Sequence, residues 1–170
     1  MKRTGVAFAV ATIFAMSWLP VQAEDYKFTA LFIFNFAKYI DWPSQDGDFV
    51  IGVLGNDPII DELKTIAGTA DLNGRKMVVK KFSSAGQVEK CGILYVTPGQ
   101  SDSLSPMVNK FGQSGVLIVT NKPGLAEAGA AINLAMIDGK QRYEINTASL
   151  KKSGLSAKPV LFKIGKVIGS

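Results

Sequence analysis

Short apolar runs alternate with helical stretches through the middle of the chain. Residues 49–54 form a continuous apolar run typical of a buried strand, and the turn at residues 55–58 leads into a helix over residues 59–67. The same order recurs, with strands expected over residues 76–82, 93–96 and 115–120 and helical stretches over residues 85–89 and 103–111. This order predicts a single α/β domain of three layers, in which a mostly parallel sheet carries helices on both faces.

The pattern changes after residue 130, where a C-terminal antiparallel hairpin is expected. Residues 131–137 and 140–146 flank Asp138-Gly139, a strong signal for a two-residue turn. With that turn, one face of the hairpin is apolar, and we expect this face to join the core. It consists of Ile132, Leu134, Tyr143 and Ile145. The other face carries, among small alanines, Asn133, Arg142, Glu144 and Asn146. This polar face is either a solvated sheet surface or a patch that binds a partner or ligand.

Two helices are expected at the end of the chain. Thr147 is placed to cap a short helix that Gly154 ends, and Ser156 to cap a second helix with Pro159 in its first turn. One face of the second helix would gather Val160, Leu161, Ile164, Val167 and Ile168, with Lys158, Lys163 and Lys166 away from it. The apolar face predicts packing on the sheet.

The segment from residue 28 to residue 43 is rich in aromatic side chains, and a helix there would be ended by Trp42-Pro43. Steps of about 100° per residue place Leu31 and Phe34 on one side of this helix, among the polar side chains of Lys27, Asn35, Lys38 and Asp41. One interpretation is a core helix with a broad apolar face. The other is a contact with a partner or a second copy, because apolar anchors ringed by polar groups are typical of recognition surfaces.

The first residues have the pattern of an export signal. Lys2-Arg3 precede an apolar run over residues 5–19 that is too short to span a bilayer, and Val21-Gln22-Ala23 forms a small-residue cleavage site. We therefore expect a signal peptide over residues 1–23 and a mature domain over residues 24–170, the alternative being a retained membrane anchor. Cleavage would lower the formal net charge of +5 by two. The remaining basic residues are spread along the chain, so nucleic-acid binding is not expected.

The residue types needed for most catalytic sites are missing. The chain has no histidine, and its single cysteine, Cys91, cannot complete a zinc site or an internal disulfide. The position of Cys91 before the apolar run at residues 92–96 is typical of a small buried hydrophobe, with an intermolecular bridge or a reactive thiol as the alternative. The Ser-x-Lys pairs at residues 149–151 and 156–158 and the loop at residues 52–55 match no complete catalytic or phosphate-binding motif. We expect neither an enzyme nor a bound metal or cofactor.

Several segments together resemble the YfiR-like family of exported bacterial proteins. The most specific are the helix motif at residues 32–43 and the strand Arg142-Tyr143-Glu144-Ile145-Asn146. Further matches follow in the same order, at residues 51–58, 115–121, 132–134 and 154–156. The resemblance thus covers nearly all of the chain after residue 23.

This resemblance implies a periplasmic, often dimeric α/β domain without catalytic activity. The best-known member of the family holds an inner-membrane diguanylate cyclase inactive by binding its periplasmic sensor region, and an outer-membrane lipoprotein relieves that repression by sequestering it. The paired cysteines of that member are absent from this chain, so a redox-controlled stability of that kind is not expected.

The resemblance and the two candidate surfaces lead to one functional hypothesis. We expect a periplasmic homodimer, not inserted in the membrane, that binds an inner-membrane sensor and lowers cyclic-di-GMP output, with a lipoprotein as a possible antagonist. The candidate contact residues are Leu31, Phe34, Asn133, Arg142, Glu144 and Asn146. The alternative is a periplasmic module that binds an amino acid or a nucleotide-like ligand at the face of Arg142 and Glu144.

Overall fold

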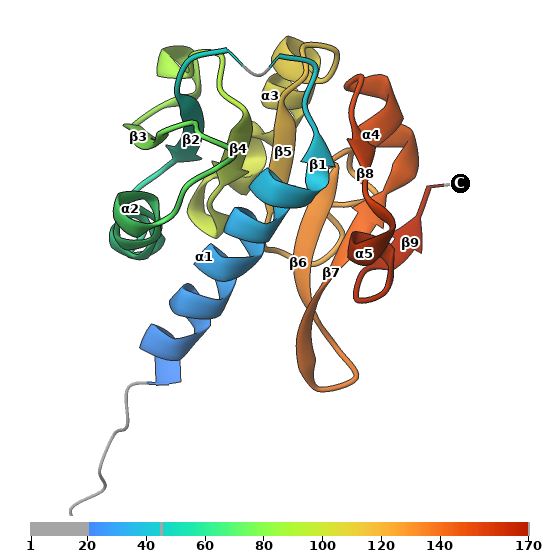
Figure 1. The fold of residues 1–170 in the computed structure, drawn as a ribbon. Helices are drawn as coiled ribbons and strands as arrows, with labels where there is room; N and C mark the ends of the chain where they lie inside the picture. Colours follow the sequence, from blue (N-terminus) through green and yellow to red (C-terminus); the bar gives the residue numbers. More distant parts are fainter. Residues whose placement is uncertain (1–20, 45, 170) are drawn as a thin grey trace, which may run out of the picture.

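The computed structural model describes residues 21–44 and 46–169. Most of the predicted signal peptide, residues 1–20, lies outside the described residues, so its cleavage remains a prediction. The helices in Figure 1 are α1 (Val21–Tyr39), α2 (Ile59–Thr69), α3 (Leu104–Phe111), α4 (Thr147–Lys152) and α5 (Pro159–Phe162), with short 3₁₀ turns at Ala85–Gln87 and Pro98–Ser103. No helix in the described part of the chain is both long and apolar enough to cross a membrane.

The main sheet has seven strands in the order β3-β2-β4-β5-β6-β7-β9. They are β2 (Phe49–Leu54), β3 (Met77–Phe82), β4 (Ile93–Val96), β5 (Leu117–Thr120), β6 (Ile132–Ile137), β7 (Lys140–Asn146) and β9 (Lys166–Ile168). All neighbouring strands run parallel except β6 and β7, which form the predicted antiparallel hairpin. In that hairpin Asn133 pairs with Glu144 and Leu134 with Tyr143, as the Asp138-Gly139 turn predicts.

Both faces of the central strands are buried because successive side chains enter two different cores. In β4, Ile93 and Tyr95 join one cluster with residues of α1 and α2, whereas Leu94 and Val96 join a second cluster with residues of α3. This confirms the predicted α/β domain with a mostly parallel sheet and helices on both faces. It also explains why these strands have continuous apolar sequences rather than alternating ones.

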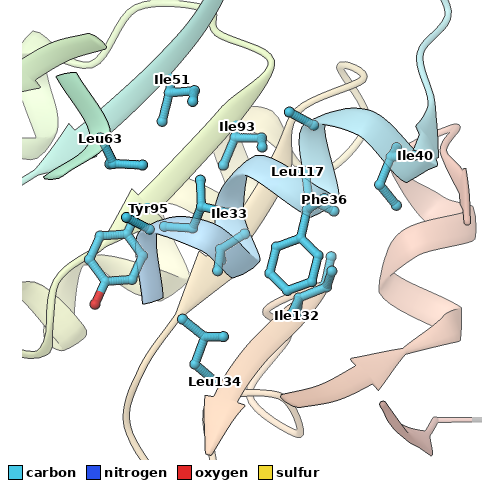
Figure 2. Packing of buried hydrophobic residues seen from close by; sticks show 14 of the residues in the cluster. Ile33, Phe36, Ile40, Ile51, Leu63, Ile93, Tyr95, Leu117, Ile132 and Leu134 are labelled. Atoms are coloured by element: carbon cyan, nitrogen blue, oxygen red, sulfur yellow. The ribbon is translucent and has the colours of Figure 1, made fainter. Parts of the chain in front are cut away.

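The α1 helix lies across one face of the sheet (Figure 1) and supplies much of the first core. Ile33 and Phe36 are fully buried, and Figure 2 shows them among side chains from β4, β5 and β6. The Tyr143 ring meets Phe36 edge-on, with 4.9 Å between ring centroids, and its hydroxyl donates a hydrogen bond to the Leu161 carbonyl at 2.8 Å. Burial raises the pKa of Tyr143 to about 12, so the hydroxyl remains a donor.

The α1 helix ends at Tyr39, three residues before the predicted stop at Trp42. The next two residues leave the helix because they form a small second sheet, in which β1 (Ile40–Asp41) pairs antiparallel with β8 (Ser156–Ala157). The Trp42 indole N–H donates to the Ala37 carbonyl at 2.8 Å, and the indole contacts Phe49 edge-on. Trp42 therefore joins the end of the helix to the first strand of the main sheet.

The predicted second C-terminal helix is wrong. Ser156 belongs to β8, only Pro159–Phe162 is helical, and residues 166–168 form β9, which pairs with β7. Pairing gives the backbone groups at the edge of β7 hydrogen-bond partners, and the apolar spacing of this segment fits a strand as well as a helix. The preceding helix, α4, is capped by the Asn146 side chain, which accepts from the Ser149 N–H, and not by Thr147.

Gly165 allows the turn from α5 into β9 to lie directly on the hairpin. A Cβ atom at this position would come within 2.6 Å of the Tyr143 ring and 2.8 Å of the Ile145 side chain. We expect Gly165→Ala to lower the free energy of unfolding by about 1–3 kcal/mol, because the Tyr143 ring is held and cannot move aside.

Gly68, in α2, provides the matched control because a Cβ there would meet no atom within 4 Å. Gly68→Ala should raise the free energy of unfolding by about 0.4–1 kcal/mol. Urea denaturation of both variants measures the contrast. Equal effects of the two substitutions would show that the fit of Gly165 against Tyr143 does not limit stability.

Candidate functional site

The six predicted contact residues lie on two opposite faces of the molecule. Leu31 and Phe34 are on α1, which covers one face of the sheet. Arg142 and Glu144 alternate along β7 with Tyr143 and Ile145, which are buried beneath α1. Arg142 and Glu144 therefore project from the other face, together with Asn133 and Asn146. The two groups cannot form a single site.

Leu31 and Phe34 differ in how far they reach solvent. Leu31 is 39% exposed, and the neighbouring Phe28 on the preceding turn is 48% exposed. Phe34 is half-buried and packs against the core that α1 shares with α2. The outer face of α1 thus presents an apolar strip beside the exposed side chains of Lys27 and Lys38.

Asn133 organises the polar face from inside the protein. Its side chain is fully buried, and its oxygen accepts from the Thr120 hydroxyl at 2.8 Å and from the Lys122 N–H at 3.2 Å. Its amide nitrogen donates to a carboxylate oxygen of Glu144 at 3.0 Å. Asn133 therefore fixes the end of β5 and the position of the Glu144 carboxylate.

Asn146 has a similar internal role at the end of the hairpin. Its oxygen caps α4, and its amide nitrogen donates to the Ala126 carbonyl at 2.8 Å. The side chain is buried. Of the four predicted polar residues, Arg142 and Glu144 are thus the two that are partly exposed.

Arg142 borders a hollow of about 400 Å³, here called the basic hollow. Its wall comes from the hairpin tip and from the turn before β9, and includes Ile137, Asp138, Arg142, Lys163, Ile164 and Lys166. Arg142 and Glu144 do not form an ion pair, since the salt bridge found among the described residues joins Lys80 and Glu89. Three cations against one carboxylate give the hollow an excess of positive charge, which favours an anionic group.

The structure places a further exposed surface where a core helix was predicted. Residues 158–168, here called the C-terminal segment, expose four large apolar side chains by 37–48%, namely Val160, Phe162, Ile164 and Val167. The stretch 147–170 contains five lysines and no acidic residue. This local excess of positive charge is visible in the sequence. It was not predicted as a binding surface because lysines also occur throughout the rest of the chain.

Cys91 lies inside the second core, with its sulfur beside Gly52. Burial raises the pKa of its thiol to about 12. A buried thiol that keeps its proton is a poor nucleophile, so the structure favours the interpretation of Cys91 as a small hydrophobe. Among the residues described, no three side chains of the metal-binding types gather in one place.

The comparison with known families agrees with the resemblance seen in the sequence. The profile of the family described as YfiR/HmsC-like matches residues 26–166, which include every strand of the main sheet except the last two residues of β9. A search among curated proteins finds no match.

The difference in burial between Leu31 and Phe34 leads to a prediction about folding. Leu31→Asp should lower the free energy of unfolding by about 0.5–1 kcal/mol, because Leu31 is partly exposed and a carboxylate at that position can reach water. Phe34→Asp should cost at least about 1 kcal/mol, because it removes a side chain packed on the core and places a charge beside it. Thermal and urea unfolding of both variants measure this. Equal stabilities would show that the Phe34 contact with the core contributes little.

The raised pKa of Cys91 leads to a second prediction. A free thiol with a pKa near 8.5 reacts faster as the pH rises from 7 to 9, whereas native Cys91 should stay unreactive toward a thiol reagent over this range. Unfolding in urea should expose one reactive thiol per chain. Cys91→Ala should cost about 1 kcal/mol of stability. Rapid labelling of the native protein, or a reductant-sensitive dimer, would contradict the buried position.

Proposed function

The chain belongs to the YfiR/HmsC-like family, and we propose that it is a non-catalytic periplasmic repressor of an inner-membrane diguanylate cyclase. Membership of this family indicates a periplasmic regulator of diguanylate cyclase signalling. The finer proposal is that the protein binds the extracytoplasmic part of the cyclase and lowers its cyclic-di-GMP output. The family match over residues 26–166 is the observation on which this proposal rests.

The polar face and the C-terminal segment supply a suitable contact surface for this cyclase. The basic hollow adjoins Ile164 of the C-terminal segment, so positive charge and exposed apolar area lie side by side. Protein interfaces combine an apolar centre with a polar rim in this manner, and charge complementarity increases the rate of association. The proposed partner surface therefore has acidic groups opposite the basic hollow, a cationic group opposite Glu144 and an apolar centre.

The outer face of α1 is the proposed contact between two copies of the chain. Leu31 and Phe28 are exposed there, on the side of the sheet opposite Arg142. A homodimer formed through this face leaves both polar faces free to bind. We propose that an outer-membrane lipoprotein antagonist acts by competing with the cyclase for the repressor.

A second candidate function is supported by the basic hollow itself. Its volume of about 400 Å³ falls within the range of small-molecule sites, and Arg142 and Lys163 can hold a carboxylate or phosphate. In this alternative the protein is a periplasmic binding module for an anionic or zwitterionic molecule. A ligand that saturates the purified wild-type protein, but not an Arg142→Ala variant, would favour it.

Removal of a charge from the polar face tests the repressor proposal. Arg142→Ala deletes a partly exposed cation, and Glu144→Gln removes a charge while keeping an oxygen to accept from Asn133. We expect each change to weaken partner binding by about 2–5 kcal/mol, and so to raise cellular cyclic-di-GMP, because truncating a charge at an interface leaves its counterpart unpaired. Stability should change by about 1 kcal/mol or less.

Lys64→Ala, on the exposed side of α2, serves as the control because it also removes a surface cation. Cyclic-di-GMP, periplasmic abundance and melting temperature are measured for all three variants. Unchanged cyclic-di-GMP in Arg142→Ala and Glu144→Gln, at normal abundance, would assign the polar face a purely structural role. A raised level in Lys64→Ala as well would show that total charge, and not this face, matters.

A further inference from the structure

The connections that follow β2 and β4 leave a crevice beyond the carboxyl ends of these two strands. The chain leaves β2 for α2, which packs on the α1 face, and leaves β4 for α3, which packs on the opposite face. These two strands are parallel neighbours. Where adjacent parallel strands send their connections to opposite faces, the space beyond their carboxyl ends is left open, and ligands of α/β proteins bind there.

A cavity of about 180 Å³ lies at this position, here called the switch-point crevice. Its wall combines four parts of the fold, and consists of Asp25, Tyr26, Asp57, Tyr95, Pro98 and Asn121. A cavity of about 150 Å³ can hold a benzene molecule, so the crevice has room for a small organic ligand.

The turns that form the crevice are held close together. Gly55 has a φ of +113°, and a Cβ atom there would collide with the Thr97 hydroxyl, so only glycine lets the turn after β2 approach the turn after β4. Within the first turn, one carboxylate oxygen of Asp57 accepts from the Ile59 N–H at 3.0 Å. This bond fixes the carboxylate at the edge of the crevice.

The polar groups of the crevice are arranged around the Tyr95 hydroxyl. The residue is only 1% exposed, and Figure 2 shows the hydroxyl pointing away from the other labelled core side chains. The Asn121 side chain borders the crevice together with Tyr95. Asp57 lines the same crevice, and burial, followed by the charge of Asp57, raises the pKa of Tyr95.

Neither carboxylate of the crevice wall takes part in an ion pair among the described residues. This wall contains Asp25 and Asp57 but no lysine or arginine. Lys81 and Lys122, from the neighbouring strand and loop, donate instead to the uncharged oxygens of Asn56 and Ser101, at 2.8 and 3.0 Å. Two carboxylates beside the Tyr26 ring and the Tyr95 hydroxyl are suited to an organic cation, which can contact both kinds of group.

We propose that the switch-point crevice binds a small primary ammonium compound. Its three N–H donors would reach the carboxylates of Asp25 and Asp57 and the Tyr95 hydroxyl, while its hydrocarbon part contacts Tyr26 and Pro98. This site is distinct from the basic hollow, whose charge has the opposite sign, and it gives the proposed repressor a place to receive a chemical signal.

Titration of the protein purified from the periplasm with n-butylammonium chloride tests the proposal, with n-butanol as the uncharged ligand of similar shape. Isothermal calorimetry should show saturable binding of one n-butylammonium per chain and none of n-butanol. Asp57→Asn keeps the oxygen that accepts from Ile59 but loses the charge, and should weaken binding about tenfold or more. Tyr95→Phe should weaken it less.

Asp71→Asn is the matched control, because Asp71 also accepts a local backbone N–H, that of Gly74 at 2.7 Å, but does not border the crevice. It should bind n-butylammonium as the wild type does.

Should Asp57→Asn fail to fold, the variant Asp25→Asn, at an exposed position, tests the charge on the opposite wall of the crevice. Absence of saturation, equal binding of n-butanol, or wild-type affinity in Asp57→Asn or Asp25→Asn would overturn the proposal. Each of these results would leave the repressor proposal intact, because that proposal rests on cyclic-di-GMP levels.

Discussion

Tyr143 is the point at which α1, the hairpin and α5 meet. Its ring contacts Phe32 and Phe36 edge-on, at 5.4 and 4.9 Å between centroids, and its hydroxyl is bonded to the Leu161 carbonyl. Because side chains alternate along a strand, burial of Tyr143 decides that Arg142 and Glu144 face the other way. A shift of one residue in the pairing would bury both charges, which is strongly unfavourable. The polar face therefore depends on packing in the opposite layer.

The central strands and the hairpin could be predicted because their signals are local. The run at residues 49–54 matches β2, and the Asp138-Gly139 turn gave the pairing of Asn133 with Glu144. The C-terminal segment could not be predicted in the same way. Its apolar spacing suits a helix or a strand, and the decision depends on the free edge of β7 and on the space that Gly165 leaves beside Tyr143.

Some features of the candidate sites follow from local sequence patterns, whereas others depend on tertiary contacts. The side on which Arg142 and Glu144 project follows from alternation along β7, which sequence alone reveals. The burial of Asn133 and Asn146 depends instead on Thr120 and Ala126, which reach them through the fold. The switch-point crevice was missed altogether, because Asp25, Asp57 and Asn121 are far apart in the sequence and meet only through the order of the strands.

The bond from Trp42 to the Ala37 carbonyl has a consequence for observing this protein. The chain has two tryptophans, Trp18 and Trp42, and the first lies within the predicted signal peptide. After cleavage at Ala23, all tryptophan fluorescence would come from Trp42, whose indole lies between the end of α1 and Phe49. The native chain thus contains a built-in fluorophore at the joint between helix and sheet, whose emission wavelength reports the hydration of that joint without any added label.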